Sequence, residues 1–404
     1  MNEVAEKIAN KIKKTGPIPF AAFMELALYC PVYGYYETEK DSPALSCIAQ
    51  PAAPLWAERT GRDGDYYTSV SVGSLFGELL AFQFAEWLEQ IAPRSKARSA
   101  RAGIPQIVEA GAHDGRLAVD ILTWMREQRP QLLSRLRYCI VEPSPRRQAW
   151  QKARLRPFAG RVRWLKHLAA PLRGGSRITH HASRVTGIIF SNELFDAMPV
   201  HRLGWDAKKQ DWFEWAVTLQ RGQFAWTRIA PTLPLSDPRF QISNFPLALG
   251  KVLPDGFTVE ICLAAERWWS AAAESLVLGK LLTIDYGLSA EEFFVPERRE
   301  GTLRAYRNHQ PSRDVLANPG EQDLTAQVNF TALQAAGESA GLTTEGFLSQ
   351  AQFLTGIAAR TWESQAPIIQ WTHQRRRQFQ TLTHPQLMGR TFRVLVQARA
   401  AIRR

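Results

Sequence analysis

The spacing of apolar residues along the chain predicts an α/β protein. Apolar runs of strand length alternate with segments in which apolar residues recur at the helical period of 3.6 residues. The runs begin at Gln106, Tyr138, Arg161, Gly187 and Lys280. The clearest helical segment, 74–91, carries its large apolar residues on one stripe. Strands that alternate with helices in this way are typical of a mainly parallel sheet with helices on its faces.

Two parts of the chain depart from this alternation. Residues 1–30 predict two short helices interrupted at 16–19, and residues 200–270 predict hairpin strands followed by a helix over 264–278. The pattern therefore predicts four regions. They are 1–100, an N-terminal helical region with a surface insertion at 38–62 and a loop that covers a cofactor; 101–200, the first part of an α/β core; 201–278, an inserted substrate subdomain; and 279–404, the rest of the core with C-terminal helices.

A turn with two glycines follows the first predicted core strand. The sequence Glu109-Ala110-Gly111-Ala112-His113-Asp114-Gly115 separates this strand from a helical segment. Glycine allows the backbone to approach a ligand, and the start of a helix presents unpaired N–H groups to it. The Gly-x-Gly-x-x-Gly turn of dinucleotide-binding proteins is absent, which argues against an NAD-dependent dehydrogenase. By itself, the turn is equally consistent with a β-to-α connection whose glycines only serve packing.

Acidic and amide side chains end two further predicted strands. Glu142 ends the second strand, and Asn192, Glu193 and Asp196 follow the fourth. In a parallel sheet, the carboxyl ends of the strands face the ligand. Glu142 is therefore placed to accept hydrogen bonds from the hydroxyl groups of a ribose, with an ordinary strand-end acid as the alternative. Asp196 is also compatible with a helix cap.

Composition narrows the class of protein. The chain has 404 residues, of which 45% are hydrophobic and 22% charged, as in folded globular proteins. The net charge of +12 allows an anionic partner, but runs such as Arg375-Arg376-Arg377 are more often solvated helix faces, so nucleic acid is not expected. No apolar run is long enough to predict a membrane span. The four cysteines form no Cys-x-x-Cys pair, which fits a reducing compartment without a zinc site. Residues 1–14 lack the features of a targeting peptide, so the expected location is cytoplasmic.

Taken in order, these stretches resemble the MidA-like family of S-adenosyl-L-methionine (SAM)-dependent methyltransferases, which includes a mitochondrial complex I assembly methyltransferase. The resemblance covers nearly the whole chain. It rests on residues 20–29 with 34–36, 64–69 with 75–78, 109–115, 141–144, 191–199, 284–287, 301–304, 319–329 and 388–395. Matches that follow one another in the same order are far more specific than the glycine turn alone.

The resemblance implies a class I methyltransferase fold, with a Rossmann-like sheet, and SAM as the methyl donor without a metal. It places Glu109 near the ammonium group of SAM and Glu142 at its ribose hydroxyls. The residues expected to contact the cofactor are Glu109, Gly111, Ala112, His113, Glu142, Thr68, Ser69 and Asn192. The mitochondrial member is similar to a protein arginine methyltransferase that acts on a respiratory complex I subunit, which implies a protein substrate.

Methyl transfer from a sulfonium depends chiefly on holding the donor and the acceptor in line. A guanidinium is a planar fork of N–H donors, which carboxylates bind best. We therefore expect Glu193 and Asp196 to hold the acceptor and Asn192 to position the donor or the acceptor. These three residues are the predicted catalytic group.

Two departures from the family pattern keep other functions open. His113 stands where the family usually has glycine, and the insertion at 38–62 is unusually long. The alternatives are a SAM-dependent methyltransferase of a small molecule and a non-catalytic assembly or scaffold protein on the same fold. The tryptophans between 205 and 226 fit either a homodimer interface or a pocket wall.

Overall fold

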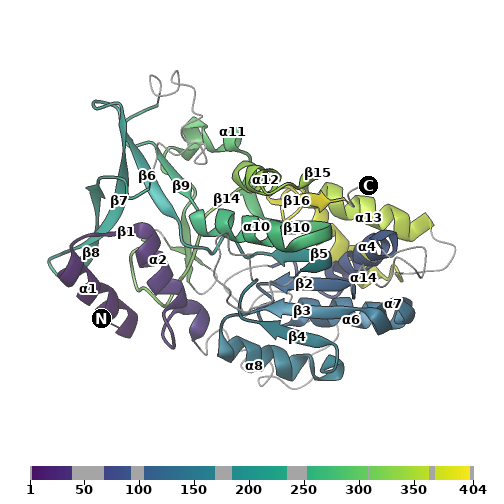
Figure 1. The fold of residues 1–404 in the computed structure, drawn as a ribbon. Helices are drawn as coiled ribbons and strands as arrows, with labels where there is room; N and C mark the ends of the chain where they lie inside the picture. The colour runs from purple at the N-terminus through teal and green to yellow at the C-terminus, as the bar shows by residue number, and fades with distance from the viewer. Residues whose placement is uncertain are drawn as a thin grey trace, which may run out of the picture. The chain divides into compact units, whose positions relative to one another are not determined.

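The structure is a computed structural model that describes residues 2–38, 68–91, 104–168, 184–233, 253–307, 310–312, 314–363 and 369–400. The chain divides into two compact units, each built from three separate segments (Figure 1). Unit 1 contains Met1–Asp41, Phe195–Glu266 and Gly287–Leu333. Unit 2 contains Ser42–Leu194, Arg267–Tyr286 and Gln334–Arg404. Apart from residue 38, the predicted insertion lies outside the described residues, as do residues 64–67 of the predicted cofactor-covering loop.

Unit 2 is organised around a mixed sheet with the strand order β15-β16-β10-β5-β2-β3-β4. The parallel strands are β2 (Gln106–Ala110), β3 (Arg137–Val141), β4 (Val162–Leu165), β5 (Val185–Asn192) and β10 (Leu276–Leu288). Two further strands, β15 (Thr343–Ser349) and β16 (Phe392–Arg399), extend the sheet in antiparallel register. The carboxyl ends of the five parallel strands therefore meet at one edge of the sheet.

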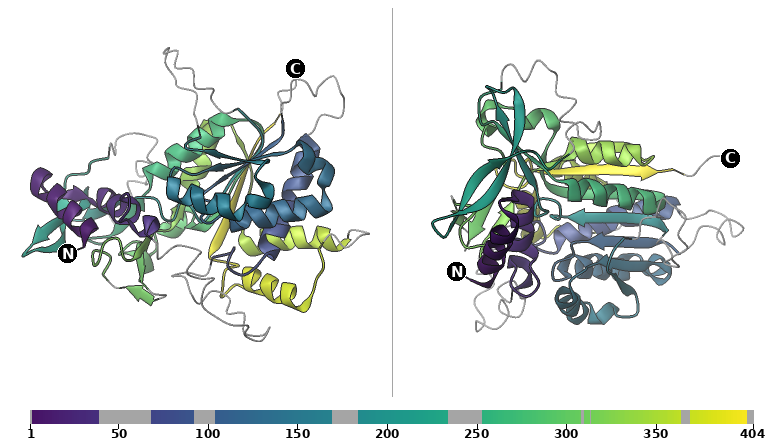
Figure 2. Two further views of the ribbon diagram at one scale, coloured as in Figure 1. Left: turned by 90° about the horizontal axis from the view of Figure 1, so that it is seen from below. Right: turned by 60° about the vertical axis from the view of Figure 1, so that its left-hand side comes forward.

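Helices cover both faces of this sheet (Figure 2). The helices of unit 2 are α4 (Leu75–Ile91), α6 (Arg116–Gln128), α7 (Pro130–Arg135), α8 (Pro145–Arg154), α13 (Gln350–Glu363) and α14 (His373–Thr383), with the short η3 (Arg156–Phe158). Helices α4, α6, α13 and α14 share one apolar core with the strands, in which the rings of Phe84 and Phe190 lie 4.9 Å apart. On α10 (Leu263–Ser275), the buried Trp269 donates its ring N–H to Gln397 of β16, at 2.8 Å.

Unit 1 contains an antiparallel sheet with the order β1-β7-β6-β9, and β8 pairs with β7. Its strands are β1 (Ile18–Pro19), β6 (His201–Asp206), β7 (Asp211–Gln220), β8 (Gln223–Ile229) and β9 (Thr258–Ile261). Helices α1 (Glu3–Thr15) and α2 (Phe20–Tyr29) pack on this sheet, and the buried Phe20 contacts Trp226 with ring centres 5.1 Å apart. The amphipathic pattern of α1 explains this packing, because its apolar stripe faces the sheet.

Smaller elements complete unit 1. A three-stranded sheet has the order β12-β11-β13, and β14 pairs in parallel with the end of β10. These elements are β11 (Arg304–Arg307), β12 (Gln310–Ser312), β13 (Asp323–Thr325), β14 (Val328–Asn329), α11 (Ala290–Phe293), η1 (Tyr35–Glu37) and η5 (Pro296–Arg298). Helix α12 (Phe330–Ser339), like α10, begins in unit 1 and ends in unit 2.

The structure confirms the predicted α/β class, with a mixed sheet, and corrects several details. The helix predicted over 264–278 ends at Ser275, and β10 begins at Leu276 rather than at Lys280. Strand β15 was not predicted at all. Of the tryptophans between 205 and 226, Trp205 is buried in an apolar cluster and Trp226 is partly buried against α2, and the role predicted for this group stays a prediction. Within the described ranges, no helix combines the length and apolarity needed to cross a membrane.

Candidate active site

The turn between β2 and α6 has a backbone that glycine adopts most easily. Gly111 and Gly115 have φ angles of 75° and 86°, in the left-handed region where a Cβ is strained. A Cβ on Gly111 would also lie 3.0 Å from Cδ1 of Leu194, which is closer than an ordinary contact. Both conformation and space therefore require glycine at position 111, as in turns whose backbone approaches a ligand.

His113, the departure from the family pattern, also adopts a left-handed conformation, with φ of 45°. Its side chain is 50% exposed, and its Nδ1 lies 3.9 Å from Oδ1 of Asp114. Its carbonyl oxygen accepts a hydrogen bond from Nε2 of Gln151, at 2.9 Å. The imidazole therefore lies at the surface of unit 2. The side chain of Gln151, on α8, holds the backbone of the turn in place.

Glu109 ends β2 as a fully buried carboxyl group. The hydroxyl of Tyr138, on β3, donates to its Oε2 at 2.7 Å. Burial raises the pKa of Glu109 to about 8, although this hydrogen bond lowers it. A cation bound next to the carboxyl would favour its charged form, so the site is suited to an ammonium group.

Glu142, at the end of β3, is also buried, and both of its carboxylate oxygens are oriented. Oε1 accepts from the backbone N–H of Ser144 at 2.9 Å, and Oε2 accepts from Nε2 of Gln151 at 3.2 Å. Gln151 is itself fully buried and also bonds to Trp164. Because Gln151 contacts both Glu142 and the His113 carbonyl, it links the two strand ends that were predicted to hold SAM. Sequence reasoning missed Gln151 and Tyr138.

At the end of β5, Asn192 and Glu193 lie together with Ser69. The carboxylate Oε1 of Glu193 accepts from the backbone N–H of Ser69 at 2.9 Å and from Nδ2 of Asn192 at 3.0 Å. Glu193 has a φ of 50°, which is rare for a residue with a side chain. Oδ1 of Asn192 is buried and has no hydrogen-bond partner within the described parts of the chain. An orphaned buried acceptor of this kind is commonly satisfied by a ligand.

The segment before α4 is fixed by its own hydrogen bonds. Thr68 and Ser71 bond to each other through the backbone N–H of each and the hydroxyl of the other, at 3.1 Å and 3.0 Å. The hydroxyl of the fully buried Ser69 donates to Gln350 at 3.1 Å. Ser71 therefore closes this turn, and the turn places Ser69 beside Glu193.

Asp285 on β10 is a third residue that sequence reasoning missed. Its side chain is fully buried, and Oδ2 accepts from the backbone N–H of Leu194 at 3.1 Å. Oδ1 accepts from the backbone N–H of Tyr286 at 2.8 Å. Asp285 thus holds the chain immediately after Glu193. The sequence signals were its place at the end of an apolar run and within 284–287, one of the stretches that carry the family resemblance.

Asp196 lies in unit 1, across the division from Glu193, so their predicted pairing stays a prediction. Its side chain is buried, and burial raises its pKa to about 7. Its carbonyl oxygen accepts from the N–H of Ala326 at 2.9 Å, and the next carbonyl, of Ala197, accepts from the Tyr29 hydroxyl at 2.9 Å. These bonds join the three stretches 20–29, 191–199 and 319–329, and the carboxylate of Asp196 is itself hydrogen-bonded to the backbone of Ala197 and of its own residue.

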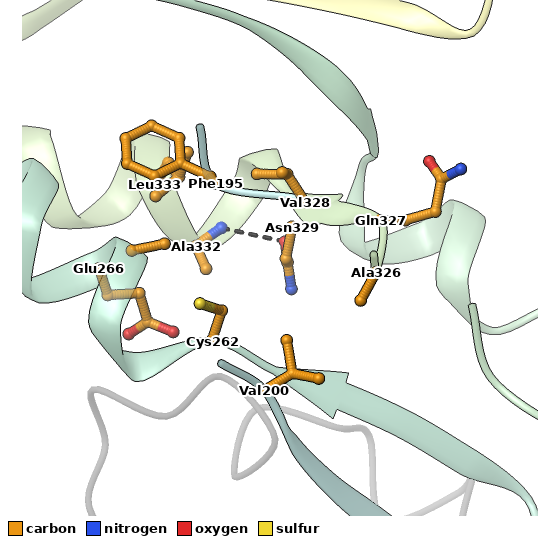
Figure 3. Close-up of a pocket in the computed structure, with 11 residues that line it drawn as sticks. Phe195, Val200, Cys262, Glu266, Ala326, Gln327, Val328, Asn329, Ala332 and Leu333 are labelled. Carbon is orange, nitrogen blue, oxygen red and sulfur yellow. Dashed lines mark hydrogen bonds between the residues drawn. The ribbon is translucent and has the colours of Figure 1, made fainter. Parts of the chain in front are cut away.

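A small cavity in unit 1 lies between β9, β14 and the start of α12 (Figure 3). Its volume of about 20 Å³ is enough for a water molecule but not for a nucleoside. Asn329 lines it and caps α12, since its Oδ1 accepts from the N–H of Ala332 at 3.1 Å. Cys262 and Val200 line the opposite side. The cavity therefore does not replace the strand ends of unit 2 as the candidate site.

The carboxyl ends of the unit 2 strands carry the kinds of group that were predicted to hold SAM. Two buried carboxyl groups end adjacent parallel strands, a glycine turn lies between one of these strands and its helix, and a buried amide oxygen is left without a partner. The described residues contain no cluster of three metal-ligating side chains. Unit 2 therefore has the architecture of a SAM-dependent methyltransferase of the α/β class.

Comparisons with known proteins agree with this class. The chain matches the family described as "Putative S-adenosyl-L-methionine-dependent methyltransferase" over residues 79–348, and it belongs to this family. It is 29% identical over 373 residues to "Protein arginine methyltransferase NDUFAF7, mitochondrial" of Xenopus tropicalis, covering 88% of this chain and 75% of the relative. The human protein of the same name is 28% identical over 378 residues, covering 86% and 71%.

A solved structure gives the same result. A COG1565 superfamily member from Burkholderia thailandensis, crystallised with S-adenosyl-homocysteine, has a TM-score of 0.74 and 27% identity. The alignment covers 98% of this chain and 92% of that chain. S-adenosyl-homocysteine is SAM without its transferable methyl group. The predicted family, enzyme class and cofactor are therefore confirmed: the chain is a SAM-dependent methyltransferase.

One prediction is wrong. The absence of targeting features in the first residues indicated the cytoplasm, but the curated relatives are named as mitochondrial proteins. The charge pattern of residues 1–14 describes an amphipathic helix, α1, which packs on the unit 1 sheet. A segment that serves the fold in this way carries no information about the compartment.

Proposed function

We propose that this enzyme methylates an arginine side chain of a protein, and that Glu193 holds the guanidinium. The observation that carries the proposal is the position of the Glu193 carboxylate at the end of β5, fixed by Ser69 and Asn192. A fixed carboxylate is the best acceptor for the planar donor fork of an arginine. The similarity to relatives named protein arginine methyltransferases supports the same acceptor.

Unit 2 supplies the residues that would hold the cofactor. SAM, when bound, supplies an electrophilic methyl group on a sulfonium. The backbone of Gly111, Ala112 and His113 would line the cofactor site, the Glu109 carboxylate would bind the ammonium group of SAM, and Glu142 would accept hydrogen bonds from its ribose hydroxyls. Thr68 and Ser69 precede α4, and Ser69 donates its backbone N–H to Glu193 at the end of β5. Oδ1 of Asn192, which has no partner among the described residues, would accept a hydrogen bond from SAM or from the arginine substrate.

The remaining step is removal of a proton from the guanidinium as the new N–C bond forms. A carboxyl group whose pKa is near the working pH accepts and returns a proton most readily. Asp196, with its pKa raised to about 7 by burial, has this property. We therefore retain Asp196 in the proposal as the predicted proton acceptor and Asn192 as the positioning residue.

The proposal also covers the organisation of the chain. Residues 201–278 form the part that receives the substrate, inserted between the core regions 101–200 and 279–404, and 1–100 supplies the cofactor-covering segment. Because the chain resembles the mitochondrial member, we propose a subunit of respiratory complex I as the protein that carries the acceptor arginine. The tests below separate the chemistry from the identity of the acceptor.

The decisive variant is Glu193→Gln. The amide keeps an oxygen that accepts from Ser69 and has nearly the same volume, so the strand end should retain its structure. We expect methyl transfer to fall by at least about a hundredfold, the usual effect of removing one group that stabilises a developing charge distribution. The affinity for SAM, measured by calorimetry, should change by less than about threefold. Glu89→Gln, an exposed acid on α4, is the matched control and should behave as the unmodified enzyme.

The acceptor is tested with isotopically labelled SAM and a mitochondrial extract from cells that lack the enzyme. Label recovered as methylarginine in a protein supports the proposal. Label in the small-molecule fraction would establish the small-molecule alternative, and intact SAM binding without any transfer would establish a scaffold. An unchanged rate in the Glu193→Gln enzyme would refute the role of Glu193 while leaving the enzyme class intact.

A further inference from the structure

The positive charge of this protein is concentrated in one stretch of the chain. Between Pro143 and Asn192 there are eleven Lys and Arg residues and no Asp or Glu. The net charge of the whole chain is +12, so the rest of the chain has a net charge of only +1. The described part of this stretch forms α8, η3, β4 and β5. Unit 2 therefore contains a stretch in which every Lys, Arg, Asp or Glu position is positively charged. In the rest of the chain, the positive and negative charges nearly cancel.

The centre of this region is β4, which is an edge strand of the sheet in the described part of the chain (Figure 1). Four exposed basic residues lie in β4, directly after it, or in α8 and η3, which precede it in the chain, and we call them the β4 basic edge: Lys152, Arg156, Arg163 and Lys166. None of the four pairs with a carboxylate among the described residues. Other basic residues nearby are engaged, since Arg154 pairs with Asp114 at 2.8 Å and Arg161 donates to the carbonyl of Leu133.

The β4 basic edge presents charge on both faces of the sheet. The ammonium group of Lys152 lies 5.4 Å from the ring centre of Trp164, on the side that packs against α8. Arg163 precedes Trp164 in the strand and is exposed, so its side chain projects from the opposite face. A strand laid beside β4 would therefore meet basic side chains on both of its faces.

Protection of a sheet edge is the simplest explanation for charges at β4. One or two charged residues are enough for that purpose, and they can have either sign. Here the charges are all positive, and no acid occurs for the length of the stretch to balance them. Repulsion between these positive charges lowers the stability of the fold. Binding of an anionic partner therefore explains the excess of positive charge better than protection of the sheet edge does.

We propose that the β4 basic edge binds an extended acidic segment of a partner polypeptide, which adds a strand beside β4. The edge offers alternating N–H donors and C=O acceptors, and an extended polypeptide can pair with both along a strand, whereas phosphate groups accept hydrogen bonds but cannot donate them to the C=O groups. Nucleic acids also favour free aromatic rings for stacking, whereas Trp150 and Trp164 are already covered by Arg146 and Lys152. None of the exposed large apolar side chains of the described residues belongs to α8, η3 or β4, so these elements offer no such side chain to a bilayer. The proposal goes beyond methyl transfer and is independent of it.

The test uses a fluorescent acidic peptide of about ten residues, the length of a long strand, whose binding is followed by anisotropy without SAM. A second peptide has the same sequence with alternate backbone amides N-methylated. It keeps the charge but cannot pair with a strand. We expect the parent peptide to bind and the N-methylated peptide to bind at least about tenfold more weakly.

Charge reversal identifies the surface. The variant Lys152→Glu, Arg156→Glu, Arg163→Glu and Lys166→Glu should weaken binding of the parent peptide by at least about tenfold. The matched control reverses four exposed basic residues elsewhere: Lys11→Glu, Lys14→Glu, Arg376→Glu and Arg377→Glu. It makes the same change in net charge and should weaken binding by less than about twofold. Melting temperatures and SAM affinity confirm that both variants are folded, so the result does not depend on the methyl transfer reaction.

Three outcomes would overturn the proposal. Equal losses in the two variants would mean that the peptide senses only the net charge. Equal binding of the two peptides would exclude strand addition. Tighter binding of single-stranded polyuridine, or of phosphatidylcholine vesicles that contain phosphatidylserine, with the same dependence on the four residues, would assign the surface to phosphate groups instead.

Discussion

The buried Glu109 carboxyl should make the protein less stable as the pH rises. Burial raises its pKa from 4.5 to about 8 in the folded protein. Between these values the folded state keeps a proton that the unfolded chain has released, so the folded state loses stability with increasing pH. Each pH unit changes the free energy by about 1.4 kcal/mol, and the interval from 4.5 to about 8 therefore amounts to about 5 kcal/mol. This stability is fully present below pH 4.5 and is lost as the pH approaches 8.

Glu109→Gln removes the titration but keeps an oxygen that can accept from Tyr138. At pH 5 the ligand-free variant and the unmodified protein should have similar thermal stability. At pH 8 the variant should be more stable by several kcal/mol, which raises the melting temperature by several degrees. Comparing the two proteins at each pH cancels the contributions of Asp120 and Asp196, whose pKa values burial also raises. Melting temperatures that run parallel from pH 5 to 8 would refute the reasoning.

The same residue should couple SAM binding to proton release. An ammonium group beside Glu109 favours the carboxylate, so binding near pH 7 should release up to one proton. Calorimetry in buffers with different ionisation enthalpies measures this number directly. The Glu109→Gln variant should release no proton from this site. Proton release that is unchanged by the substitution would move the ammonium group of SAM away from Glu109.

Three further substitutions test the contacts around the site. Gly111→Ala should lower SAM affinity by at least about tenfold in calorimetry, because it strains the turn and places a Cβ 3.0 Å from Leu194; an unchanged affinity would show that the turn can relax. Gln151→Leu leaves buried Glu142 without one of its donors and should lower SAM affinity by a similar factor, whereas equal affinity would separate Glu142 from the ribose. Asp285→Ala leaves the Leu194 N–H without its acceptor and should cost about 1–3 kcal/mol of stability in thermal unfolding, and a loss well below this range would show that water replaces the carboxylate.

The parallel strands were predictable because their apolar runs are short and are followed by polar or glycine residues. Where apolar residues continued, the prediction failed. Leu276 and Leu278 follow an alanine-rich helix, and nothing in their apolar character separates the end of α10 from the start of β10. The strand begins where Leu276 pairs with Val185 of β5, and Gly279 then pairs with Gly187 where both glycines have strongly positive φ angles. Which residues pair across the two strands depends on the tertiary structure, and the local sequence does not specify it.

The candidate site was predictable to the same extent. Glu109, Glu142 and Glu193 stand where strands end, so their positions follow from the α/β pattern. Gln151 and Tyr138 are just as closely involved, but they come from the middle of a helix and from the inside of a neighbouring strand. Their importance lies in which carboxyl group they contact, and a single sequence gives no information about such pairs.

The conformation of Glu193 is the strongest structural reason to place function at the end of β5. Gln210 and Arg221 also have positive φ, but they lie in exposed turns of the unit 1 hairpins, where that conformation is common. Glu193 follows a buried strand instead, and three hydrogen bonds hold it: its N–H donates to the Ile284 carbonyl, and its Oε1 accepts from Ser69 and Asn192. A strained residue persists only where its surroundings determine its conformation. Since glycine at this position would remove the strain and the carboxylate together, the fold maintains the strain in order to keep a carboxylate at the strand end.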